Sequence, residues 1–125
     1  MLIMMASKDL PAQLLKECSR IPFGRCLCGK AALTQDPQFA DCVDDRHDIA
    51  YEGMGPHGHY CIPIISAGEV LGVMNLYLKA GHRRDAGECN FLKAFTNVLA
   101  GIIQRKRAEE SCFPLQVFAF LCVLA

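Results

Sequence analysis

The sequence has no tryptophan, no excess of either charge and no apolar run long enough to cross a membrane. With only seven phenylalanines and three tyrosines in 125 residues, aliphatic side chains and methionine must fill most of any core. Basic and acidic residues number 13 each, and the resulting net charge of zero argues against a dedicated nucleic-acid-binding domain. Apolar residues make up 52% of the chain, which argues against intrinsic disorder and predicts one globular domain.

Neither end of the chain carries the pattern of a targeting or membrane segment. No basic residues precede the apolar run at residues 1–6, so a secretory signal peptide is not expected. The apolar tail, residues 111–125, is shorter than the roughly 20 residues that span a bilayer. We predict a cytoplasmic protein that does not associate with membranes. The tail, of unknown role, is expected in the core or at an interface, with a shortened membrane anchor as the alternative. The eight cysteines are expected as free thiols rather than disulfides.

Hydrophobic periodicity predicts an α+β fold. The two clearest strands, residues 60–66 and 70–78, are joined by Ala67-Gly68, a dipeptide typical of tight hairpins. Polar residues and glycines over 44–59 predict a loop. The other expected elements are a buried strand over 1–6, helices over 7–18, 28–33 and 85–110, and an edge strand over 38–43. Since a hairpin pairs its strands antiparallel, the helices are expected to cover the sheet.

The long helix carries an apolar pattern that follows one helical face. Its members are Phe91, Leu92, Phe95, Val98, Leu99, Ile102 and Ile103. After Ile103 the chain turns to charged and polar residues up to Glu110, a composition suited to leave the domain and join another. The charged side chains at the end of this helix could pair across a parallel dimer, and the alternative is a plain exposed helix end.

Several short stretches resemble a GAF domain in their order and spacing. They are residues 25–32 (RCLCGKAA), 41–44 (DCVD), 61–64 (CIPI) and 72–77 (GVMNLY), and residues 88–110 resemble the helix that closes such domains. The chain is similar in particular to the GAF modules of bacterial sensor histidine kinases and diguanylate cyclases. The resemblance covers residues 1–110, leaving the tail at 111–125. It implies an antiparallel sheet flanked by helices, with a long C-terminal signalling helix that pairs with its counterpart in a homodimer.

Compared with that family, the chain starts at the second strand, without the first helix and strand. An open edge beside apolar strands invites pairing. Three explanations stay open: the chain is a fragment, the tail covers the edge, or a partner chain does. The resemblance implies a non-catalytic sensory module of a two-component or cyclase system. It would bind a small ligand or a metal or redox cofactor, and signal through its closing helix to a histidine kinase or cyclase output domain.

A loop and the strand after it supply the first candidate site, a pocket for a small ligand. The loop residues Asp44, Arg46 and His47 precede Met54 and Tyr60 in the sequence. Charged groups at the mouth of an apolar cavity orient small ligands, so we expect these five residues to bind one. The alternative is a solvated loop held by local hydrogen bonds.

Two pairs of soft or borderline ligands form the second candidate, a metal site. Cys26 with Cys28, and His57 with His59, are alternate residues, which share one side of an extended chain. Two sulfurs and two imidazoles suit zinc or iron, and an iron–sulfur cluster or haem is a variant of this expectation. The alternative is that Cys28 packs as a small apolar residue and the histidines hydrogen-bond the loop.

Two other functions stay open. Some GAF proteins reduce free methionine sulfoxide with cysteine thiols, and residues 28–32 and 62–64 resemble those enzymes too. Their reactive cysteine would lie within residues 49–52, where this chain has Tyr51, so the nucleophile is missing. The other function is a ligand-free dimerisation scaffold. We therefore predict no catalytic residue.

Overall fold

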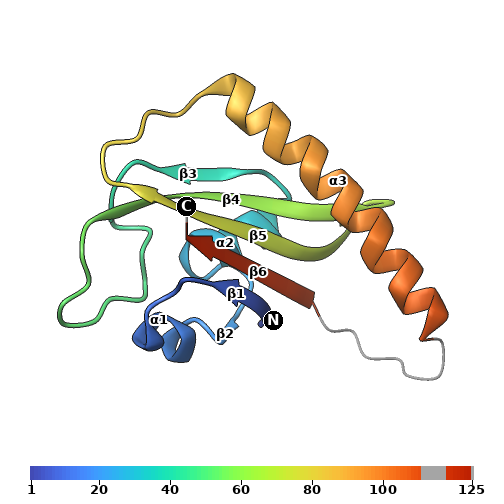
Figure 1. The fold of residues 1–125 in the computed structure, drawn as a ribbon, viewed down its shortest axis with the longest axis horizontal. Helices are drawn as coiled ribbons and strands as arrows, with labels where there is room; N and C mark the ends of the chain where they lie inside the picture. The colour runs from blue at the N-terminus through green and yellow to red at the C-terminus, as the bar shows by residue number, and fades with distance from the viewer. Residues whose placement is uncertain (111–117, 125) are drawn as a thin grey trace.

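The strands form one six-stranded sheet, with helices on both of its faces (Figure 1). A computed structural model of the chain describes the backbone of residues 1–110 and 118–124, and the side chains of residues 1–110. The elements in chain order are β1 (Leu2–Lys8), α1 (Ala12–Glu17), β2 (Arg20–Ile21), α2 (Cys26–Thr34), β3 (Gln38–Ala40), β4 (His57–Ser66), β5 (Glu69–Lys79), α3 (Ala86–Glu109) and β6 (Phe118–Leu124). The strands lie in the order β2-β1-β6-β5-β4-β3, so the α+β class is confirmed.

The hairpin of β4 and β5 is the longest pairing in the sheet, and it is antiparallel as predicted. Ala67 and Gly68 both have positive φ angles, the backbone geometry of a tight turn that matches the twist of its strands. Strand β4 begins at His57 rather than at Tyr60, so two histidines expected in a loop lie in a strand. The residue between them is Gly58, where a β carbon would lie only 2.6 Å from a backbone oxygen of β3.

Strand β6 comes from the apolar tail and lies between β1 and β5. It pairs parallel with both neighbours. The expected antiparallel pairing is found for β1–β2, β3–β4 and β4–β5, and β6 makes the sheet mixed. Its backbone thus covers the edges that β1 and β5 would otherwise present. Residues 111–117 and 125 lie outside the described structure, and the division of the chain at residue 110 stays a prediction.

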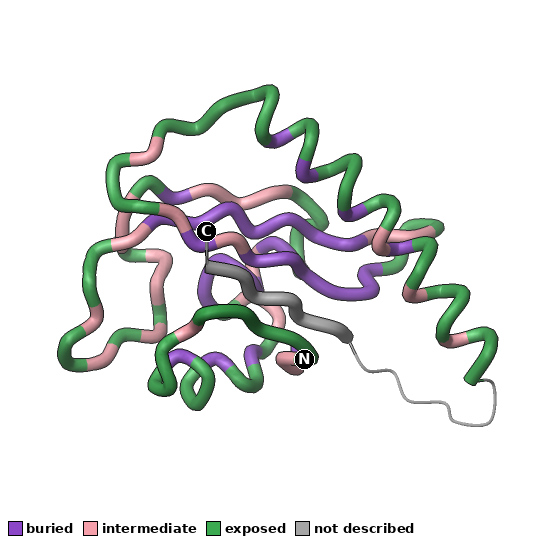
Figure 2. Tube along the Cα trace, viewed as in Figure 1, coloured by how far each residue is buried: buried purple, intermediate pink, exposed green. Residues whose placement is uncertain are grey.

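Alternate residues of β4 and β5 pack on opposite faces of the sheet. On one face, Cys61 and Tyr77 join residues of α1 and α2 in the larger core cluster. On the other face, Tyr60 and Met74 pack against Leu92 of α3. Both strands are buried along most of their length (Figure 2). A displacement of either strand therefore changes the packing on both faces.

Helix α3 has two apolar faces, not the single face expected. The fully buried positions, which face the sheet, are Cys89, Leu92, Thr96 and Ala100. The apolar side chains left exposed are Phe91, Phe95, Val98 and Ile102. At 100° per residue the predicted apolar set covers an arc of about 140°, and the sheet contacts only one side of that arc. In the described part of the chain, no helix combines the length and apolar character needed to pass through a bilayer.

The N-terminal elements correct three expectations. Strand β1 continues through Ser7, which the sequence pattern places at the start of a helix, and a positive φ angle at Asp9 follows the strand. Helix α1 is therefore shorter than predicted and begins after Pro11. Strand β1 is fully buried only at Leu2. The two-residue strand β2 is not predicted from the sequence, because so short a segment has no periodicity to detect.

Candidate functional site

A small chamber lies between the sheet and the elements that cover its α2 face. Its walls come from α1, β2, α2, the loop at residues 41–56, β4 and β5. Among them are the apolar Leu14, Ile21, Leu27 and Met54 and the polar His47, His57, His59 and Asn75. Its free volume is about 20 Å³, which holds one water molecule or one metal ion. An organic ligand needs several hundred Å³, so this chamber excludes one unless it opens.

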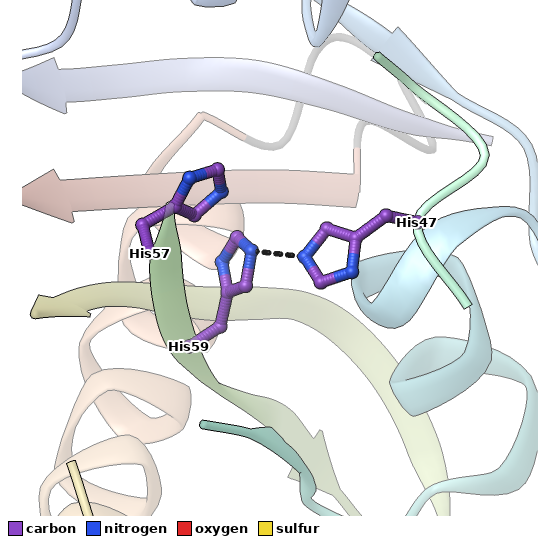
Figure 3. Close-up of side chains that lie close together, drawn as sticks. All are labelled: His47, His57 and His59. Carbon is purple, nitrogen blue, oxygen red and sulfur yellow. Dashed lines mark hydrogen bonds between the residues drawn. The ribbon is translucent and has the colours of Figure 1, made fainter. Parts of the chain in front are cut away.

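Three histidines meet at the chamber, one from the loop and two from β4 (Figure 3). His57 and His59 are alternate residues of β4, so they project from the same face of the strand. His47 reaches them from the loop, and its Nε2 lies 2.6 Å from the Nε2 of His59. Each residue offers a ring nitrogen, and the three nitrogens lie within 4.8 Å of one another. The arrangement is thus a cluster of three imidazoles at one point.

The outer nitrogens of the two β4 histidines have hydrogen-bond partners. Nδ1 of His57 lies 2.8 Å from the carbonyl oxygen of Gly55 and donates to it, since a carbonyl only accepts. Nδ1 of His59 lies 3.1 Å from Oδ1 of Asn75 and donates to that amide oxygen. A neutral imidazole has one N–H, so in the neutral form Nε2 of each ring carries a lone pair, and that of His59 lies 2.6 Å from Nε2 of His47.

His47 has the opposite arrangement. Its Nδ1 accepts the backbone N–H of Asp44 at 3.1 Å, so its Nε2 carries the proton that it donates to His59. Burial lowers the pKa of His47. Burial, reinforced by charge repulsion from His47 and His57, lowers the pKa of His59 to about 3. His47 and His59 are therefore neutral at neutral pH, the state in which imidazole nitrogens bind cations.

The loop before β4 is held over the chamber by two sets of contacts. Arg46 donates to both carboxylate oxygens of Asp44, and its Nη2 donates to the Phe39 carbonyl of β3 at 2.8 Å. On the other side, Asp48 accepts the backbone N–H of Cys26, and its own N–H lies 3.1 Å from the Cys26 sulfur. His47 lies between Arg46 and Asp48, so the contacts of these two residues hold it in place from both sides.

The five predicted ligand-binding residues do not gather at one place. His47 and Met54 line the chamber. Asp44 and Arg46 bind each other, and the guanidinium holds the pKa of the Asp44 carboxyl down at about 2. Tyr60 lies on the opposite face of the sheet, where its hydroxyl contacts α3. All five were expected around one ligand because residues 44–59 were predicted as a loop, which leaves unspecified the face of the sheet that Tyr60 takes.

Cys26 and Cys28 do not join the two β4 histidines. Helix α2 begins at Cys26, so the two cysteines lie on a helix, where residues two apart do not face each other. The sulfur of Cys28 lies 3.7 Å from the sulfur of Cys61 instead. Its hydrogen bond to Cys61 and its burial raise the pKa of Cys28 well above the usual range, which keeps the thiol protonated. Within the described residues, the one group of three or more potential metal ligands is the histidine cluster.

Two comparisons with known proteins find matches. A family model described as a GAF domain matches residues 3–104. A solved structure described as the structure of the GAF domain superposes with a TM-score of 0.57 and 29% sequence identity. The match covers 68% of this chain and 49% of the other, so this chain spans about half the length of that one. No curated protein matches the chain significantly.

Proposed function

Since the chain belongs to the GAF domain family, a family of sensory and ligand-binding modules, we propose that it is the non-catalytic sensory module of a bacterial signalling protein. The signal is an occupant of the chamber at the three histidines. Helix α3 passes it to an output domain of the histidine kinase or cyclase type. The residue in place of a reactive cysteine is Tyr51, whose half-buried side chain packs against the core, which favours a non-catalytic role.

Strand β4 connects the chamber with α3 through two consecutive residues. His59 faces the chamber, and the next residue, Tyr60, faces α3. The Tyr60 hydroxyl donates to Oε2 of Glu88 at 3.0 Å and accepts the backbone N–H of Asp85 at 2.9 Å. It therefore binds the first turn of α3 directly. Because protein interiors are close-packed, a shift of β4 on ligand binding moves this contact as well.

The outward face of α3 provides the observation that carries the proposal. Phe91, Phe95, Val98 and Ile102 are between 44% and 69% exposed. They recur at spacings of four, three and four residues, the repeat by which helices pair in coiled coils. We call these four residues the α3 stripe. An exposed apolar stripe with this repeat fits the same stripe of a second copy.

A groove beside the α3 stripe supports the same partner. Its volume is about 450 Å³, and it lies between the first turns of α3 and the strands β4 and β5. Its lining is Tyr60, Leu76, Leu78, Gly87, Glu88, Phe91 and Leu92. Phe91 belongs to both the groove and the stripe, so the two form one continuous apolar surface. A helix from a second copy would cover both.

The oligomeric state of the full chain tests this proposal. We expect a dimer at micromolar concentration in sedimentation equilibrium. Phe95→Glu places a charge in the pairing surface, and desolvating an unpaired charge costs about 3 kcal/mol or more. The dimer dissociation constant should therefore rise by roughly 100-fold or more. Val98→Glu should act in the same direction.

Gln104→Glu is the matched control, because it adds the same charge at an exposed position of α3 outside the stripe. It should leave the dissociation constant within about threefold of the original. A monomeric wild-type chain, or equal weakening by Gln104→Glu, would contradict pairing through the stripe.

A further inference from the structure

We propose that His47, His57 and His59 form a binding site for a divalent transition-metal ion, held by three imidazole nitrogens with one coordination position left open. The site deepens the proposed function, because it names the class of occupant that the chamber takes. The metal site depends on the proposed function only for the claim that the bound ion acts as the signal. Metal binding and helix pairing are measured separately, so either idea can fail without the other.

The distances between the ring nitrogens suit a metal ion. Zinc lies about 2.0–2.1 Å from histidine nitrogens, so two nitrogens of a tetrahedral centre are about 3.3 Å apart. The three nitrogens here lie within 4.8 Å of one another, and Nε2 of His47 and Nε2 of His59 are 2.6 Å apart. The required separation falls between these two values. In Figure 3 the rings of His47 and His59 point toward each other, with His57 beside them.

The two β4 histidines are already oriented as metal ligands. A metal-binding histidine usually donates its other ring N–H to an oxygen, which fixes the ring and strengthens the ligand. His57 donates in this way to the Gly55 carbonyl, and His59 donates to Asn75. The amide nitrogen of Asn75 donates to the sulfur of Cys28 at 3.3 Å, so the amide oxygen stays turned toward His59. The two rings are thus fixed in place before any ion arrives, with the Nε2 lone pair of His59 accepting from His47 until an ion replaces that proton.

The third ligand, His47, changes its tautomer when an ion binds. Without an ion, its Nε2–H donates to His59. When the ion displaces this proton from Nε2, the proton moves to Nδ1 of the same ring. Nδ1 then gives up the hydrogen bond from the Asp44 backbone N–H and can donate to Oδ1 of Asp44, 3.6 Å away. The Asp44 carboxylate, paired with Arg46, stays ionised and is available to accept a hydrogen bond from the new Nδ1–H. An ion that replaces the shared proton therefore joins the loop to β4 through a coordinate bond.

The surroundings favour a single transition-metal ion over other occupants. A free volume of about 20 Å³ holds one ion and no larger occupant. Three nitrogen donors suit zinc, copper, nickel and iron, whereas calcium and magnesium prefer oxygen ligands. Three protein ligands leave a fourth position on a zinc-type centre, where water or an exogenous ligand binds.

Cobalt(II) and zinc(II) binding to the full, chelator-treated chain tests the site. We expect one cobalt ion per chain, with the strong visible absorption of a four-coordinate centre, and its displacement by zinc. His47→Ala, His57→Ala and His59→Ala should each weaken zinc binding by roughly 100-fold or more in calorimetry. The matched control is His82→Ala, because His82 pairs with Glu88 apart from the cluster and should leave binding unchanged.

Three results would overturn the proposal. They are no stoichiometric binding by the folded wild-type chain, equal weakening by His82→Ala, and a sulfur-to-cobalt charge-transfer band, which would place a cysteine in the coordination shell. Circular dichroism establishes that each variant folds. The half-buried His57 gives the most tolerant substitution if the buried His59 variant does not fold. A chain that dimerises but binds no metal rejects the site and leaves the proposed function standing.

Discussion

Tyr60→Phe removes one oxygen atom at the contact between the sheet and α3. Tyr60 is 1% exposed, and its ring packs against Phe39 with centroids 4.8 Å apart, a contact that phenylalanine keeps. What is lost is the hydroxyl, which donates to Glu88 at 3.0 Å and accepts the N–H of Asp85 at 2.9 Å. The substitution therefore isolates the hydrogen bonds that join β4 to the first turn of the helix.

The loss of stability depends on whether Glu88 and the N–H of Asp85 find other hydrogen-bond partners in the variant. Glu88 has a side chain 44% exposed and keeps its contact with His82, so its carboxylate is readily hydrated. The N–H of Asp85 loses its acceptor, and a hydrogen bond of this kind contributes about 0.5–1.5 kcal/mol net. Together the two losses should lower the free energy of unfolding by about 1–2 kcal/mol. Hydrogen exchange should accelerate most at the amides that begin α3.

Urea unfolding monitored by circular dichroism measures this change, with Tyr51→Phe as the matched control. Tyr51 is half-buried, and no hydrogen bond of its hydroxyl is found among the described residues. The control should stay within about 0.5 kcal/mol of the wild type. If the two variants unfold at the same urea concentration, the hydrogen bonds of the Tyr60 hydroxyl do not stabilise the contact between β4 and α3. The proposed coupling between the chamber and α3 would then be unsupported.

Two further predictions concern packing and pH. Gly58→Ala should lower the free energy of unfolding by about 1–3 kcal/mol in urea titrations, because its β carbon would meet backbone oxygens of Ala40 and Asp41 at 2.6 and 3.1 Å. Gly55→Ala is the control, because no atom lies within 4 Å of its β carbon. If both substitutions lower the free energy of unfolding equally, β3 shifts to make room for the methyl group at residue 58. Burial raises the pKa of Cys18 from 9.0 to about 12, so the folded state holds this proton while the unfolded state loses it above pH 9. Cys18 should therefore account for a fall of about 1 kcal/mol in stability between pH 8 and pH 10, in addition to the fall from Cys26 and Cys28, whose pKa values are also raised in the folded state. An unchanged slope in Cys18→Ala would refute this assignment.

The pairing of His57 with His59 could be predicted from the sequence, because alternate residues share a face in any extended chain. The third member, His47, was predicted only for a different site. Its position depends on the contacts of Arg46 with β3 and of Asp48 with α2, and the spacing of residues in the sequence does not reveal these contacts. The one sequence signal was the presence of three histidines within residues 47–59. Cys28 was placed with them because the start of α2 was predicted two residues too late.

The fold could be predicted where a periodic pattern was long. The β4–β5 hairpin and α3 follow from repeats of two and of about 3.6 residues, and both are found near the predicted bounds. The division of α3 into two apolar faces could not be predicted, because an apolar arc of this width can pack wholly against the sheet or leave one side exposed. The parallel pairing of β6 between β1 and β5 is a long-range contact, and an apolar tail alone does not specify its neighbours.

The chamber and the α3 stripe lie on opposite sides of the same strands, and this has a thermodynamic consequence. Coupling between two sites is reciprocal: if an ion at the histidines changes the dimer dissociation constant by some factor, dimerisation changes the ion's affinity by the same factor. Here the path is short, from His59 to the adjacent Tyr60 and from its hydroxyl to the start of α3. An ion that clamps the loop to β4 acts on one end of this path, and a partner helix acts on the other. Because β4 takes part in both contacts, a shift of this one strand is enough to make helix pairing depend on whether an ion occupies the chamber.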